Sequence, residues 1–194
     1  MNHKFETQHL LEPFITFVQN QFKASIKTIR VDNGLEFISM RNFFLKKGIE
    51  CQRTCVYTPQ QNGVVERKHI HILNTARALL FQSHLPLEFW GECVLTTTYI
   101  INRLSSPLLK NKSPFELLYN QPPSLSHLKT FGCLCYATVV SPKQKFDPCA
   151  RQCIFIGYPR NKKGYKLFDI DTDTFFTSRD VTFHKSVFPF CQQS

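Results

Sequence analysis

Two acidic residues, Asp32 and Glu66, occur in sequence contexts suited to metal-dependent chemistry. Asp32 follows the β-type run 26–31, and Glu66 opens a helical pattern after a loop rich in Gln, Asn and Gly. Carboxylates supply the hard oxygen ligands that Mg²⁺ prefers, and two metal ions can clamp a phosphodiester for in-line displacement. Taken alone, Asp-Asn-Gly is an ordinary turn and a glutamate at a helix start is an ordinary dipole partner. A strand-end Asp facing a helix-borne Glu would suit phosphoryl transfer on nucleic acid, but without further matches around the two residues the ordinary interpretations are favoured.

The elements that must position these carboxylates follow from hydrophobic periodicity. Apolar spacing predicts helices over 6–22, 36–47, 64–81 and 87–104, and strands over 26–31 and 49–55. Pro13 lies inside the first helical pattern, so that helix either begins there or is kinked. A proline-rich stretch, 105–127, indicates a linker with one helical turn at 115–119. Five short β-type runs then predict a small barrel, at 132–140, 152–158, 165–170, 174–178 and 180–183.

Several short segments, in a consistent order, resemble the integrase region of copia-type long-terminal-repeat retrotransposon Pol polyproteins. These segments are 32–37, 58–69, 89–92, 131–136, 157–159 and 163–166. The resemblance covers nearly the whole chain. It implies an α/β plus β fold, in which a partial ribonuclease-H-like integrase core precedes a small SH3-like β-barrel. The expected domains are a truncated core at 1–104, the linker at 105–127 and the barrel at 128–190.

The same resemblance implies DNA integration by Mg²⁺- or Mn²⁺-dependent strand transfer, with Asp32 and Glu66 as two of three catalytic, metal-binding carboxylates. The third family carboxylate is an Asp on an upstream strand, and the only acids before Asp32 here are Glu6 and Glu12. We therefore expect the first three strands of the core to be missing and the chain alone to be catalytically incompetent. Whether Met1 is the true start is left open by the sequence.

A basic composition agrees with a nucleic-acid partner. Lys and Arg number 24 against 14 acids, a formal net charge of +10, which favours sequence-indifferent binding to DNA. Exposed polar and basic side chains near the two carboxylates and in one predicted turn are the candidate DNA contacts. They are Asn33, Gln60, Gln61, Asn62, Arg67, Lys68, His69, Arg160, Lys162 and Lys163. The alternatives are an ordinary solvated loop, a plain exposed helix face and a solvated basic turn.

Eight cysteines raise the question of a zinc site or disulfides. Cys133 with Cys135, and Cys149 with Cys153, are spaced like two zinc-ligand pairs. Each pair falls in a β-type run, and cysteine is among the most buried residue types, so reduced core thiols are the favoured interpretation. No signal peptide or membrane-length apolar run is evident, so we expect an intracellular protein outside membranes.

Two other functions remain open from the sequence. The chain could be a non-enzymatic DNA-binding protein that reuses a remnant of the integrase scaffold, or a non-functional retrotransposon remnant. The family role additionally implies a nuclear location and homo-oligomerisation. Salt-dependent DNA binding by a cooperatively folding protein would favour the first alternative, and aggregation on expression the second.

Overall fold

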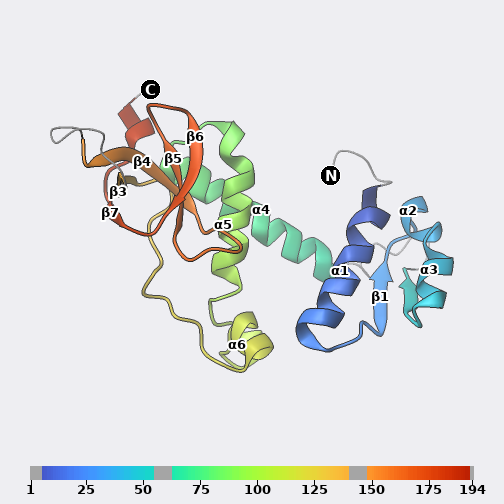
Figure 1. The fold of residues 1–194 in the computed structure, drawn as a ribbon. Helices are drawn as coiled ribbons and strands as arrows, with labels where there is room; N and C mark the ends of the chain where they lie inside the picture. The colour runs from blue at the N-terminus through green and yellow to red at the C-terminus, as the bar shows by residue number, and fades with distance from the viewer. Residues whose placement is uncertain (1–5, 55–62, 140–147, 193–194) are drawn as a thin grey trace. The chain divides into compact units, whose positions relative to one another are not determined.

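The computed structural model describes residues 6–54, 63–139 and 148–192 (Figure 1). The chain packs as two compact units, Met1–His69 and Ile70–Ser194, each with a hydrophobic core of its own. The division falls inside helix α4 (Gly63–Ser83) rather than in the proline-rich stretch. The predicted family domains, 1–104 and 128–190, thus do not coincide with the packing units and stay a prediction.

The first unit is built around a parallel pair of strands. Its elements are α1 (Glu6–Phe22), β1 (Thr28–Val31), α2 (Leu35–Ile38), α3 (Arg41–Lys46) and β2 (Glu50–Arg53). Thr28 lies opposite Glu50 and Val31 opposite Arg53, so the carboxyl ends of both strands meet at one edge. Ile15, Met40, Phe44 and Ile49 form the buried core. The ribonuclease-H-like character of this unit stays a prediction.

The continuous helix predicted at 36–47 is wrong, because the segment forms two short helices. The Ser39 hydroxyl donates to the Glu36 carbonyl at 2.8 Å, and α2 ends at Ile38. A serine hydroxyl competes with the backbone for such carbonyls, which interrupts helices at positions that an apolar stripe cannot reveal. The first helix, by contrast, runs unbroken through Pro13 from Glu6, so it does not begin at the proline.

The second unit joins helices to a five-stranded antiparallel sheet. Its helical elements after α4 are η2 (Leu87–Phe89), α5 (Trp90–Ile101), η3 (Pro107–Leu109), α6 (Pro114–Tyr119) and η4 (Pro189–Gln192). Its strands are β3 (Leu134–Thr138), β4 (Ala150–Gly157), β5 (Tyr165–Asp169), β6 (Thr174–Ser178) and β7 (Val181–His184). The strand order is β6-β5-β4-β3-β7. The five predicted strands are confirmed in place, with Val140 outside the described residues.

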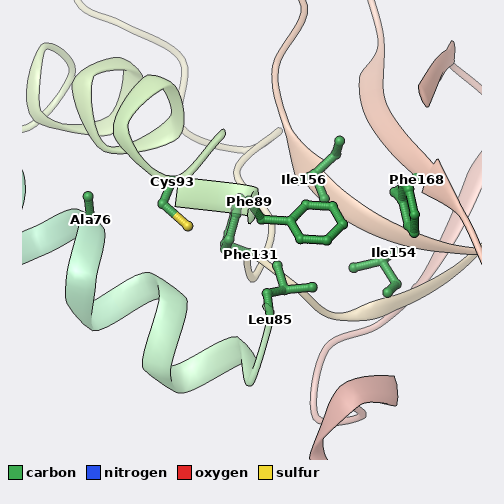
Figure 2. Close-up of a cluster of buried hydrophobic side chains, with 8 residues drawn as sticks. All are labelled: Ala76, Leu85, Phe89, Cys93, Phe131, Ile154, Ile156 and Phe168. Carbon is green, nitrogen blue, oxygen red and sulfur yellow. The ribbon is translucent and has the colours of Figure 1, made fainter. Parts of the chain in front are cut away.

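The helices of this unit pack against one face of the sheet (Figure 2). Phe89 is 2% exposed, and its ring meets Phe168 edge to face with centroids 5.0 Å apart. Ile154 and Ile156, both on β4, face the same cluster. Burying one phenylalanine side chain stabilises a fold by about 1.5–3 kcal/mol. The packing of the helices at 70–104 against the sheet therefore stabilises both.

The opposite face of β4 forms a second core, because side chains alternate along a strand. Cys153 and Phe155 point into it, together with Cys133, Cys135, Ala137 and Leu167. Strand β4 is thus covered on both faces, as its central place in the sheet requires.

Gly132 marks a close approach between α4 and the sheet. It has φ of +76°, and a side chain there would overlap Cβ of Ser83. Its N–H donates to the Phe155 carbonyl at 2.8 Å. Only glycine satisfies both the backbone angle and the contact.

Among the described residues, none of the helices combines the length and apolar character required to cross a bilayer.

Candidate active site and nucleic-acid surface

Asp32 stands at the carboxyl end of β1, immediately after buried Val31. The Asp32 side chain is exposed, and its Oδ1 accepts the Gly34 N–H at 3.0 Å. The Asn33 amide donates to the Thr54 carbonyl at 3.0 Å, just beyond β2. These two bonds fix a short turn at the edge where the parallel strands end. The turn holds Asp32 in solvent, where an incoming ligand can reach it.

Glu66 lies in the first turn of α4, and its side chain is also exposed. That position is favourable for a carboxylate, since unpaired N–H groups give a helix start a partial positive charge. Residues 55–62 between β2 and α4 lie outside the described residues. The juxtaposition of Asp32 and Glu66 stays a prediction.

Both carboxylates are chemically suited to Mg²⁺, because they are solvent-accessible hard oxygen donors. Within the described ranges, no group of three or more His, Cys, Asp or Glu side chains is arranged to hold a metal ion. The assignment of Asp32 and Glu66 as metal ligands stays a prediction.

The predicted DNA contacts fall into three sets in the structure. Arg67, Lys68 and His69 are exposed along the first turns of α4. Arg160, Lys162 and Lys163 are exposed in the connection between β4 and β5. Asn33 is exposed too, although its amide is engaged with the Thr54 carbonyl. The remaining three candidates, Gln60, Gln61 and Asn62, lie outside the described residues.

The cysteines behave as core thiols rather than as two ligand pairs. Cys133, Cys135 and Cys153 are buried in one apolar cluster, while Cys149 is exposed. Burial raises the pKa of Cys133 and of Cys153 to about 11, and raises that of Cys135 still further.

The sequence did not reveal a pocket that the second unit forms between α5 and the β4–β5 connection. We call it the tyrosine pocket, and it encloses about 360 Å³. It is lined by Tyr99, His127, Tyr158, Pro159, Lys162, Lys163, Gly164, Tyr165 and Arg179. These residues come from four separate segments of the chain, so no local sequence motif could predict the pocket. The two lysines were the only members that a basic turn could indicate.

Curated proteins similar to this chain include three that match nearly its whole length. Two are the retrovirus-related Pol polyproteins from transposons RE1 and RE2 of Arabidopsis thaliana, each 38% identical over 92% and 91% of the chain. The third, from transposon TNT 1-94 of Nicotiana tabacum, is 37% identical over 94% of it. The chain is homologous to copia-type transposon Pol polyproteins. It spans 12–14% of the length of these relatives.

The retroviral polymerase SH3-like domain matches residues 133–194 of this Pol homologue. That match begins just before β3 and contains all five strands of the antiparallel sheet. The SH3-like assignment is thereby confirmed, and the matched segment contains a five-stranded antiparallel sheet. A simian T-cell lymphotropic virus intasome, solved in complex with PP2A regulatory subunit B56 gamma, resembles the structure at 13% identity and a TM-score of 0.46. That match covers 91% of this chain and 64% of the viral one.

Proposed function

We propose that this chain is the part of a retrotransposon integrase that contributes two catalytic carboxylates and a DNA-binding surface. The observation that carries the proposal is the exposed Asp32 at the end of a parallel strand, in a chain homologous to transposon Pol polyproteins. Glu66, exposed at the start of α4, is the second carboxylate. The substrate is DNA and the reaction is strand transfer.

The residues have separate roles in this proposal. Asp32 and Glu66 would hold Mg²⁺ or Mn²⁺, which supplies Lewis-acid stabilisation of charge on the attacking and leaving oxygens. The turn at Asn33 and Gly34 orients Asp32. Arg67, Lys68 and His69 attract the phosphate backbone beside Glu66 and position it without reading bases.

Two carboxylates supply too few ligands to hold two divalent ions tightly, so the 194-residue chain alone should be inactive. A third carboxylate, carried by a preceding segment of the polyprotein, would complete the centre. We expect a fusion of this chain to the corresponding preceding segment of the tobacco relative to transfer strands in the presence of Mg²⁺.

Matched charge-neutral variants test the assignment in that fusion. Asp32→Asn and Glu66→Gln should each abolish joining of a labelled DNA end to a target duplex, since each removes a ligand charge and keeps the shape. Glu36→Gln serves as the control, because Glu36 lies in the first turn of α2, where a carboxylate is a favourable partner of the helix dipole. Activity that survives Glu66→Gln, or metal-dependent joining by the unfused chain, would overturn the proposal.

DNA binding by the unfused chain should be electrostatic and indifferent to sequence. The net charge of +10 favours counterion release, and the affinity should therefore fall steeply as salt is raised. Scrambled duplexes should bind alike in fluorescence anisotropy. A marked preference for one short duplex at physiological salt would contradict this expectation.

A further inference from the structure

The tyrosine pocket has a rigid aromatic wall. Tyr99 of α5 stacks on Tyr158 with centroids 4.1 Å apart and planes 17° apart. The ring of His127 stands edge-on to both, and its Nε2 lies 2.8 Å from the Tyr99 hydroxyl. The Lys129 N–H donates to the Tyr158 hydroxyl at 3.1 Å. These contacts hold the rings in place before any ligand arrives, which lowers the entropy cost of binding.

The pocket is also electropositive. Lys162, Lys163 and Arg179 line it, and none of the described residues that line it is acidic. Arg179 has Asp180 as a neighbour at 3.7 Å, but both side chains are largely exposed, so this pair screens the site weakly. Arg103 adds a further cation behind the wall, with its guanidinium 3.4 Å from the Tyr99 ring centroid. An anion is therefore the ligand that the charge distribution favours.

The volume of the pocket and the residues that line it restrict the class of ligand further. One water occupies about 30 Å³ of liquid, so 360 Å³ exceeds what a lone phosphate or small ion needs. The volume falls in the range of small-molecule sites, which combine apolar walls with a few placed polar groups. A phosphate attached to an aromatic base satisfies the cationic side and the ring-lined side together.

We propose that the tyrosine pocket binds one unpaired nucleotide of single-stranded DNA. Its phosphate lies against Lys162, Lys163 and Arg179, and its base lies against the rings of Tyr158 and Tyr165, which both line the pocket with centroids 6.4 Å apart. This proposal deepens the proposed function and rests on DNA being the substrate. A paired base cannot enter the pocket without leaving its stack, so the strand must be single there.

Binding of labelled oligonucleotides to the full 194-residue chain tests the proposal. The probes are a single strand, its duplex, a single strand of equal length with abasic sites throughout, and RNA of the same sequence. We expect the single strand to bind more tightly than the duplex. The abasic strand should bind about 5- to 150-fold more weakly than the intact one, the effect of one base stacked on aromatic side chains.

Two double variants distinguish the effect of the pocket lysines on DNA binding from the effect of overall positive charge. K162Q/K163Q should lower the slope of log affinity against log salt by roughly 1.4 for single strands, since each phosphate contact contributes about 0.7. The charge-matched control is K110Q/K185Q, which removes two exposed lysines of the same unit from outside the pocket. Because all four lysines are exposed and none belongs to a core cluster, each double variant should retain the wild-type melting curve.

Three results would overturn the proposal that the tyrosine pocket binds a nucleotide, while leaving the proposed function intact. They are equal binding of intact and abasic strands, duplex binding as tight as single-strand binding, and equal effects of the two double variants. Tighter binding of RNA than of DNA would overturn the assignment to DNA. Loss of binding to every DNA probe would count against the proposed function as well.

Discussion

The Nζ atom of Lys166 lies 2.6 Å from Oε1 of Glu92, which joins strand β5 to helix α5. The side chains are 30% and 19% exposed, so this ion pair is more shielded from water than a surface pair. Lys166 Nζ also lies 5.2 Å from the centroid of the Phe175 ring. The contact ties the helices at 70–104 to the sheet.

We predict that Glu92→Gln and Lys166→Met each lower the free energy of unfolding by roughly 1–2 kcal/mol, and that the double variant is less than additive. The measurement is a double-mutant cycle by urea denaturation. Lys112→Met is the control, because its pair with Glu116 is longer, at 3.8 Å, and more exposed. That change should cost about 0.3–0.5 kcal/mol. Strict additivity at Glu92 and Lys166 would show that the pair contributes nothing.

We predict that Gly132→Ala destabilises the second unit by more than about 2 kcal/mol. The added methyl group would overlap Ser83 and force an alanine into a positive-φ conformation. Gly91→Ala provides the opposite case, because Gly91 lies in α5 with open space around it. An alanine there should stabilise the helix by about 0.5–1 kcal/mol. Thermal melts of the two variants should shift in opposite directions, and equal shifts would contradict the predicted contact.

We predict that stability declines in mild acid because of His127. Burial lowers the pKa of His127 from 6.5, and the nearby Arg103 and Lys129 lower it further. The folded state therefore holds a neutral ring while the unfolded chain takes up a proton, so unfolding becomes easier as pH falls below about 6.5. The stabilisation that the neutral His127 ring provides is fully present above about pH 6.5. It decreases as the pH falls from there to the pKa of His127 in the folded state.

His127→Gln should flatten this pH dependence in urea denaturation between pH 7.5 and 5. His71→Gln is the control, because His71 is exposed on α4 and should leave the slope unchanged. An unchanged slope in the His127 variant would exclude this residue as the source.

We predict that the first unit yields to protease before the second. Its sheet has two strands and its core has four buried residues, whereas the second unit has a five-stranded sheet and two core clusters. Isolated two-stranded sheets are marginally stable in water. Trypsin should release fragments of 1–69 while the fragment from 70 onward persists. Equal resistance of both units, with one sharp unfolding transition, would contradict the prediction.

Local periodicity predicted most elements of the fold because each was encoded by its own residues. The strand at 174–178 has the predicted bounds, with alternating side chains after the turn at Asp171–Asp173. Periodicity could not show what a helix packs against. The apolar stripes at 64–81 and 87–104 indicated helices, but tertiary contacts such as those of Phe89 with Phe168 and of Glu92 with Lys166 join them to the sheet. The predicted boundary at 104 missed that contact.

The position of Asp32 could be predicted from local sequence, whereas the tyrosine pocket could not. Asp32 was predicted at a strand end, and the parallel pairing of β1 with β2 places it there. The tyrosine pocket could not be predicted, since Tyr99 and Tyr158 lie 59 positions apart in the sequence and meet only in the folded chain. Aromatic residues scattered through a sequence are usually core residues, and only tertiary geometry separates the two roles.

The three buried thiols of the SH3-like sheet have a consequence for chemical durability. Oxidants and alkylating reagents attack the thiolate, and the raised pKa values of Cys133, Cys135 and Cys153 keep these groups protonated at neutral pH. Their burial also denies reagents access. The buried thiols of the domain should therefore resist oxidation. A maleimide probe should modify the exposed Cys191 long before it modifies the buried cysteines.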